Sequence, residues 1–198
     1  DDFSNDGTVE KLKKLNIFKK IQKIIFHSKN MGKGGAIKTA QKYIDGDLTI
    51  IQDADLEYDP NDYYELIKPF KDKKVKVVYG SRVLGKKRYL EGKGFISKSR
   101  IFFNHVLTII SNILNNQNLT DAHTCYKVFR SEIFKKIQLY ENDFAFCPEV
   151  TSKISKLKIP IVEVPIKYEG RTTSEGKKIS IKDGFRAIFV LIKYKFFS

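Results

Sequence analysis

The sequence predicts a single α/β domain over residues 1–198, built around an open, mainly parallel sheet with helices on both faces. Short runs of β-branched residues alternate along the chain with segments whose apolar residues repeat every three or four positions, as strands and helices do in doubly wound folds. Polar residues follow directly after successive apolar runs, where open α/β sheets place their ligands. The length allows one substantial core and is too short for two comfortable ones.

Composition narrows the class of partner. Apolar residues make up 41% and aromatic residues 13% of the chain, which excludes general disorder. The net charge of +14 indicates a polyanionic partner: nucleic acid, anionic lipid head groups or a phosphorylated substrate, among which composition does not choose. No apolar run reaches the roughly 18 residues that span a bilayer. Cys125 and Cys147 form no C-x-x-C motif, and we expect both to be reduced, in a cytoplasmic setting.

The most informative stretch is 50–60, IIQDADLEYDP, in which an apolar run ends in a cluster of carboxylates. Thr49 to Ile51 predict the end of a parallel strand buried on both faces. If the extended geometry continues, Asp53 and Asp55 point to one side and Glu57 can join them. Such a cluster suits a hard divalent cation, Mg2+ or Mn2+, which prefers oxygen ligands and keeps positions open for substrate phosphates. The spacing alone fits a solvated acidic turn equally well.

The elements before this stretch follow from the same signals. Apolar residues spaced three apart predict a helix over 8–21, and a short apolar run predicts a strand over 23–27. A loop with three glycines and Lys33 then precedes a helix from about residue 36 to 43. Glycine-rich loops at helix starts bind phosphate because their backbone N–H groups can face an anion. A plain tight turn is the alternative.

After the acidic stretch, a helix over 60–70 leads to a strand over 75–79 that ends in Gly80-Ser81-Arg82. An arginine at a strand tip can bind a phosphate through its planar fork, although an ordinary surface arginine gives the same pattern. The apolar helix over 101–114 belongs either to the core or, with one side, to a membrane interface.

The last third of the chain predicts a loop entering a strand over 121–130, a short helix over 131–137 and a helix over 144–156. Pro165 places the strand over 161–166 at a sheet edge. A basic polar loop leads to a basic amphipathic helix over 182–198, which is typical of membrane-surface binding. A solvated helix face is the alternative.

Five segments in a fixed order carry a family resemblance: DDFSNDGT at 1–8, NMGKGGA at 30–36, QDADLEYDP at 52–60, YGSR at 79–82 and GRTTSEGKKI at 170–179. Together they resemble glycosyltransferase family 2, and within it the polyprenol-phosphate sugar synthases of the dolichyl-phosphate mannose synthase type. The resemblance runs through nearly the whole chain and implies a GT-A fold. The family begins with a strand and a P-x-[YF]-N-E segment, both absent here, so we expect the fold to lack its first strand and helix.

The resemblance also implies roles for particular residues. Asp53, Asp55 and Glu57 match the metal-binding D-x-D-x-[QE] positions, for Mg2+ or Mn2+. Asp2 would contact the nucleotide of a nucleotide-diphosphate sugar, with Lys33 and Asp53 on the same donor side. The acceptor phosphate would be held by Ser81, Arg82, Arg100, Arg171 and Lys178. The catalytic residues would be Asp55 and Arg82.

The implied reaction is an inverting transfer of the sugar to a polyprenyl phosphate by a metal-dependent hexosyltransferase that is peripheral on the cytoplasmic face of a membrane. A phosphomonoester is largely ionised near pH 7, since its second pKa is about 6, so no strong general base is required. The positive charge of the chain would serve both the anionic donor and an anionic membrane surface.

Two alternatives remain open. A family-2 transferase that acts on a sugar hydroxyl, as in polysaccharide or glycolipid assembly, would need a carboxylate base, for which Asp121 and Glu149 are candidates. The alternative of another class is a basic nucleic-acid-binding domain. Against it, the aromatic residues lie in apolar stripes rather than between lysines on strands, and no RRM, KH or helix-turn-helix signature is present.

Overall fold

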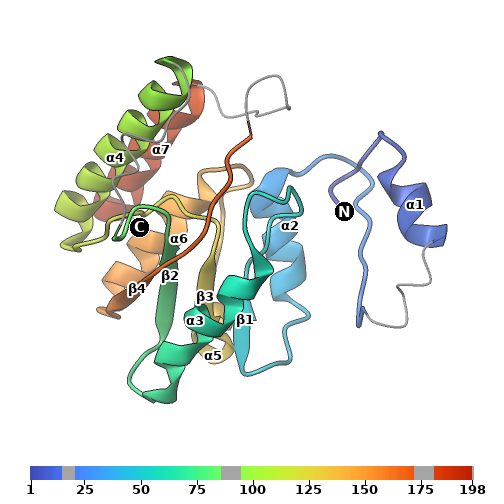
Figure 1. The fold of residues 1–198 in the computed structure, drawn as a ribbon, viewed down its shortest axis with the longest axis horizontal. Helices are drawn as coiled ribbons and strands as arrows, with labels where there is room; N and C mark the ends of the chain where they lie inside the picture. Colours follow the sequence, from blue (N-terminus) through green and yellow to red (C-terminus); the bar gives the residue numbers. More distant parts are fainter. Residues whose placement is uncertain (15–20, 86–94, 172–180, 198) are drawn as a thin grey trace.

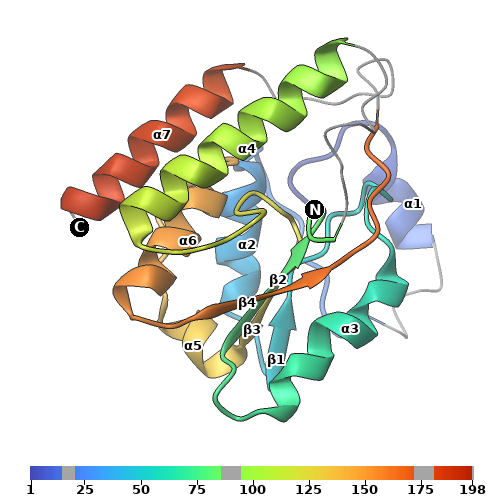
Figure 2. The same cartoon turned by 60° about the vertical axis from the view of Figure 1, so that its left-hand side comes forward.

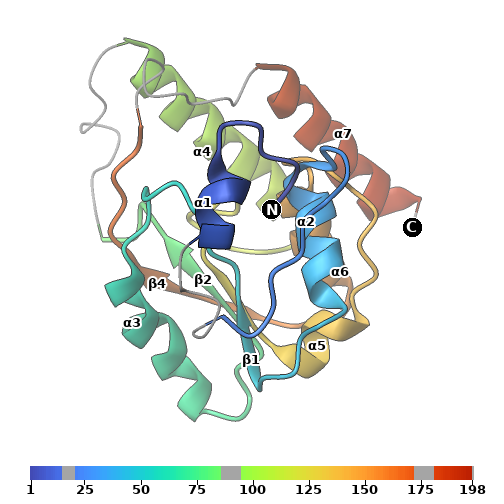
Figure 3. The same ribbon diagram turned by 90° about the vertical axis from the view of Figure 1, so that its right-hand side faces the viewer.

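Figure 1 shows the protein as a computed structural model, which describes residues 1–14, 21–85, 95–171 and 181–197. The strands are β1 (Leu48–Ile50), β2 (Val77–Ser81), β3 (Lys127–Arg130) and β4 (Ile161–Pro165). The helices are α1 (Thr8–Lys14), α2 (Gly32–Gln41), α3 (Tyr63–Ile67), α4 (Phe95–Asn115), α5 (Ser131–Lys136), α6 (Phe146–Lys156) and α7 (Ile181–Phe196), and 3-10 turns at Pro60–Asp62 and Lys68–Lys71 flank α3. Helix α3 lies on one side of the strands and α2, α5 and α6 lie on the other (Figure 3), so the α/β class with helices on both faces is confirmed.

The sheet of the described residues is mixed rather than mainly parallel. Its order is β1-β3-β2-β4, and β3 runs antiparallel to both of its neighbours while β2 and β4 are parallel. Lys127 at the start of β3 pairs with Tyr79 near the end of β2, because α4 and the segment after it return the chain to the end of the sheet where β2 finishes. A strand that enters there has to run back, and the alternation of helices and strands does not reveal this direction.

Two strands border the sheet within the described ranges. The edge position that Pro165 predicted for β4 is confirmed. Strand β1 was expected to be covered on both faces, but it is a half-buried border strand. The strand predicted over 23–27 is not formed. This segment is instead held beside the N-terminus by hydrogen bonds from the Asp1 amino group to the Ile25 carbonyl oxygen and from the His27 N–H to the Asp1 carbonyl oxygen.

Helix α2 begins at Gly32, four residues before the predicted start, so the glycine-rich segment forms its first turn rather than a loop. Gly34 and Gly35 are buried, and a Cβ atom on Gly34 would collide with the backbone of Glu141. The N–H of Gly35 donates to the carbonyl oxygen of Asn142 at 3.0 Å. These glycines therefore serve close packing of the helix against the loop before α6.

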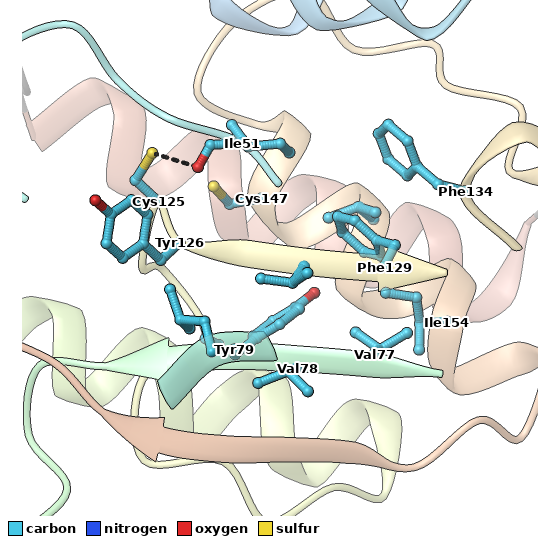
Figure 4. Close-up of a cluster of buried hydrophobic side chains, with 14 of the residues drawn as sticks. Ile51, Val77, Val78, Tyr79, Cys125, Tyr126, Phe129, Phe134, Cys147 and Ile154 are labelled. Carbon is cyan, nitrogen blue, oxygen red and sulfur yellow. Dashed lines mark hydrogen bonds between the residues drawn. The ribbon is translucent and has the colours of Figure 1, made fainter. Parts of the chain in front are cut away.

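The core lies around β2, which is buried along its whole length. Figure 4 shows side chains of β2 and β3, among them Tyr79 and Phe129, meeting Ile154 of α6. The Tyr79 hydroxyl and the Thr151 hydroxyl of α6 are 3.0 Å apart. Ile51, directly after β1, belongs to the same core, so the start of the acidic segment that follows it is held in place.

Helices α4 and α7 lie side by side at one flank of the molecule (Figure 2). Their inner faces are buried, but their outer faces expose large apolar side chains: Phe102, Phe103, Ile109 and Ile113 on α4, and Phe185, Phe189, Ile192 and Phe196 on α7. Helix α4 is therefore both a core helix and the carrier of an exposed apolar face. None of the helices, over the residues that the structure describes, has the length and apolar character needed to cross a membrane.

Candidate active site

The acidic segment 52–59 leaves β1 as an irregular loop instead of continuing the strand. Leu56 has a φ of 60°, in the left-handed region that residues other than glycine rarely adopt, and its side chain is 90% exposed. The chain turns here, and the Glu57 N–H donates to Asp55 Oδ1 at 3.2 Å. The expected continuation of the extended geometry through Glu57 is therefore wrong. Within the described ranges, no three His, Cys, Asp or Glu side chains are placed to hold a metal ion together.

Each of the two aspartates of the D-x-D motif faces a cation. The Lys33 ammonium, in the first turn of α2, donates to Asp53 Oδ2 at 2.7 Å. Burial alone would lower the pKa of Lys33, but the neighbouring Asp53 carboxylate helps to raise it above its ordinary value, so the amine stays charged. Arg171 donates from Nη2 to Asp55 Oδ2 at 2.9 Å. Both aspartate side chains are partly exposed.

Glu57 holds the segment that carries Arg171 through several hydrogen bonds. Its side chain is 8% exposed, and it accepts hydrogen bonds from the Tyr168 hydroxyl at 2.7 Å, from the Arg171 N–H at 2.9 Å and from Arg171 Nε at 3.2 Å. The backbone adds a hydrogen bond from Glu169 N–H to the Glu57 carbonyl oxygen and a β-bridge between Tyr58 and Tyr168. These contacts fix residues 168–171 beside the acidic loop.

The donor set fits a divalent cation in part. Asp53 and Asp55 offer partly exposed carboxylate oxygens, which are the ligands that Mg2+ and Mn2+ prefer, and such ions are commonly held by one or two carboxylates together with substrate phosphates. The carboxylate of Glu57 is already occupied by Tyr168 and Arg171. A metal on Asp53 and Asp55 would thus have to compete with Lys33 and Arg171, and the ligand role of Glu57 stays a prediction that this geometry does not favour.

Asp2 caps helix α2. Its two carboxylate oxygens accept the N–H groups of Met31 and Gly32, both at 2.7 Å, and His27 Nδ1 lies 2.8 Å from Oδ1. Burial opposes ionisation, but the hydrogen bonds from His27 and from these two N–H groups lower the pKa of Asp2 below its ordinary value. The carboxylate is therefore occupied by protein donors, and its contact with a nucleotide stays a prediction.

Arg82 and Ser81, expected at the acceptor phosphate, are both buried. Arg82 donates from Nε at 2.6 Å and from Nη2 at 2.8 Å to the two oxygens of Asp121, and its N–H also reaches Asp121. Burial alone would lower the pKa of Arg82, but Asp121 raises it, so the guanidinium stays charged. The Ser81 hydroxyl is 2.6 Å from that of Thr120 and accepts the N–H of Leu84. A phosphate that binds the Arg82 guanidinium would have to displace the Asp121 carboxylate.

The remaining site predictions are placed as follows. Arg100 belongs to α4, but its side chain lies outside the described part of the structure, as does Lys178. Glu149, a candidate base, is fully buried and accepts two backbone N–H groups and the Lys153 ammonium. Neither Glu149 nor the paired Asp121 is presented to a substrate in this conformation.

Tyr168 is the site residue that sequence reasoning missed. Its hydroxyl donates to Glu57, its ring stacks edge-on against Tyr58 at 5.1 Å, and the Arg82 guanidinium lies 5.1 Å from the ring centre. It thus contacts both the acidic loop and the buried arginine. No motif marks it, because a tyrosine near the end of an edge strand is common.

The chain has the GT-A fold. It superposes on the crystal structure of glucosyl-3-phosphoglycerate synthase from Mycobacterium tuberculosis in complex with uridine diphosphate with a TM-score of 0.67 and 11% sequence identity, over 98% of this chain and 66% of that one. At this identity the likeness shows the fold alone. Another structure of the same enzyme, in complex with Mn2+ and UDP-glucose, gives a TM-score of 0.62 and 13% identity.

The chain belongs to glycosyl transferase family 2, whose model matches residues 1–138. It is 27% identical over 176 residues to a UDP-N-acetylglucosamine–dolichyl-phosphate N-acetylglucosaminyltransferase of Methanococcus voltae, over 86% of this chain and 68% of that protein. It is also 27% identical over 204 residues to a dolichyl-phosphate beta-glucosyltransferase of Trichomonas vaginalis, over 98% of this chain. The chain spans 60% of the length of this second relative.

Proposed function

We propose that the protein containing this chain is an inverting hexosyltransferase that moves a sugar from a nucleotide-diphosphate sugar to a polyprenyl phosphate. The observation that carries the proposal is the pairing of both D-x-D carboxylates with cations, Asp53 with Lys33 and Asp55 with Arg171, at the end of β1. In such a site the two basic side chains can bind phosphate groups and the two carboxylates can bind a cation. Two relatives that act on dolichyl phosphate by name support the acceptor.

Asp53 and Asp55 would hold a divalent cation, Mg2+ or Mn2+, and such an ion neutralises negative charge as a sugar–phosphate bond breaks. Mn2+ is present in solved structures of the glucosyl-3-phosphoglycerate synthase that shares the fold. On the side of the chain itself, Lys33 lies next to Asp53 and can contact the donor diphosphate from the first turn of α2.

The surroundings of the two candidate bases support a phosphate acceptor. A sugar hydroxyl needs a carboxylate base, but Glu149 is fully buried and Asp121 is occupied by Arg82. A phosphate acceptor is already ionised near pH 7 and needs positioning instead of deprotonation. Arg171, whose guanidinium lies at the edge of the acidic loop, is the described cation best placed to align it.

A lipid-linked acceptor requires access to a membrane surface. The outer faces of α4 and α7 each expose four large apolar side chains, all of them phenylalanine or isoleucine. The exposed Lys195 lies in the last turn of α7, whereas Lys193 in the same turn pairs with Glu141. Apolar side chains that enter the interface and lysines that face anionic head groups are the features of a helix lying on a membrane. We propose that this pair of helices faces the membrane, on its cytoplasmic side.

The test is sugar transfer to polyprenyl phosphate by the intact protein, by its Asp55→Asn variant and by the control Asp47→Asn. Asp47 is an exposed aspartate at the opposite end of β1. Asp55→Asn removes a carboxylate that would hold the divalent cation, so its kcat/KM should fall about 100-fold or more, while Asp47→Asn keeps normal activity. Equal activity of the two variants would refute the assignment of Asp55.

A further inference from the structure

Arg171 occupies the position of a counter-cation in the acidic loop. Its Nη2 donates to Asp55 Oδ2 at 2.9 Å, and its Nε donates to Glu57 Oε1 at 3.2 Å, so one guanidinium bridges two of the three carboxylates that the sequence assigns to a metal. A divalent cation bound to Asp55 would lie close to this guanidinium. Two like-charged groups at such a distance repel each other strongly where water is partly excluded.

Several further contacts hold Arg171 in this bridging position. Glu57 is buried and receives the Tyr168 hydroxyl in addition to two N–H groups of Arg171, and the backbone of residues 168–171 is tied to the acidic loop by the Glu169-to-Glu57 hydrogen bond. Tyr168 is itself held by the ring of Tyr58. Arg171 therefore has a defined place beside Asp55, with Glu57 and Tyr168 fixing the segment that carries it.

We propose that Arg171 is an internal counter-cation that competes with a divalent cation for Asp55, and that Glu57 and Tyr168 are positioning residues that set the strength of this competition. The inference rests on the proposed function, which assigns the cation to Asp55. When the cation binds, Arg171 gives up its bond to Asp55, and its guanidinium becomes available to an anion. Binding of the metal then precedes binding of the acceptor phosphate, because the same side chain serves both.

Competition makes a reciprocal prediction: whatever weakens the hold of Arg171 on Asp55 must strengthen binding of the cation. The test is a titration of the intact protein with Mn2+ alone, followed by the electron paramagnetic resonance signal of the unbound ion. Arg171→Gln should lower the dissociation constant about two- to fivefold, the range expected for loss of a partly exposed ion pair. Arg171→Lys, which keeps the charge, should stay near the wild type. Tyr168→Phe changes no charge and should shift the constant in the same direction as Arg171→Gln, by less.

The matched control is Arg186→Gln, which removes the same charge from α7, where Arg186 pairs with Glu141 and Asp143 instead of the acidic loop. Its dissociation constant should equal that of the wild type. A second readout is hydrogen exchange in the peptide that spans residues 168–171, which saturating Mn2+ should accelerate, because loss of the Arg171–Asp55 bond removes one of the contacts that hold this segment beside the acidic loop. An unchanged or weaker affinity of Arg171→Gln, unchanged exchange, or no binding of Mn2+ to any variant would overturn the proposal.

The outcome is separable from that of the proposed function, because the titration contains no sugar nucleotide and no lipid. Transfer of sugar by a wild type whose Arg171→Gln variant binds Mn2+ no more tightly would reject the competition and leave the function standing. The predicted order of Mn2+ affinities in a protein that transfers no sugar to polyprenyl phosphate would reject the acceptor and leave the competition standing.

Discussion

Asp121→Asn removes the carboxylate charge that balances the buried guanidinium of Arg82. The two side chains are 8% and 3% exposed and are joined by hydrogen bonds of 2.6 and 2.8 Å, with a third from the Arg82 backbone N–H at 3.1 Å. Breaking a buried ion pair on one side leaves an uncompensated charge and costs about 3–5 kcal/mol. For a domain of this size, each kcal/mol corresponds to roughly 2–4 °C in Tm, so Tm should fall by about 6–20 °C.

The assay is urea unfolding followed by far-ultraviolet circular dichroism, since the chain contains no tryptophan. The control is Glu65→Gln, which breaks the exposed Glu65–Lys68 pair and should cost at most about 1 kcal/mol. The double variant Arg82→Met/Asp121→Leu, which replaces both charges with apolar groups, should recover most of the loss. A loss for Asp121→Asn no larger than that of Glu65→Gln would refute the conclusion that Arg82 is held by a buried pair.

Two further predictions concern the fold. Burial, together with the positive charges of Lys127 and Arg82, lowers the pKa of His123 to about 4. Between about pH 6.5 and 4 the unfolded chain therefore binds more protons than the folded one. The free energy of unfolding should fall by about 1–3 kcal/mol as the pH drops through this window. His123→Gln should flatten that slope in urea unfolding at a series of pH values, and an unchanged slope would exclude His123 as its source. Gly34→Ala should destabilise the fold by about 1–3 kcal/mol, because the new Cβ atom collides with the Glu141 backbone. The control is Gly184→Ala in α7, where a Cβ atom meets no neighbour, and this variant should be stabilised by about 0.5–1 kcal/mol. Equal effects of the two substitutions would contradict the close packing of α2.

The sequence predicted the features that local patterns determine. The α/β class, the acidic cluster directly after a strand and the edge position of β4 all follow from apolar periodicity and from Pro165. The direction of β3 did not, since it depends on the path of α4 and the segment after it. The start of α2 was also missed, because the N–H groups of its first turn are capped by Asp2, a residue far away in the sequence.

The sequence identified several residues of the candidate site but not how their side chains are arranged. The spacing placed Asp53, Asp55 and Glu57 on one side of an extended segment, but the chain turns at Leu56, and the Glu57 carboxylate binds Tyr168 and Arg171. The partners that decide the electrostatics come from distant segments: Lys33 for Asp53, Arg171 for Asp55 and Asp121 for Arg82. Pairings of this kind require the three-dimensional fold, because no spacing rule connects their members.

The most direct test of the central claim is the transfer of a labelled sugar into the organic phase by the intact protein, with polyprenyl phosphate as acceptor and GDP-mannose, UDP-glucose and UDP-N-acetylglucosamine offered in turn. We expect lipid-linked product with at least one donor, dependent on a divalent cation and lost in Asp55→Asn. Transfer to a sugar hydroxyl with polyprenyl phosphate left unused, or lipid-linked product that persists in Asp55→Asn, would contradict it.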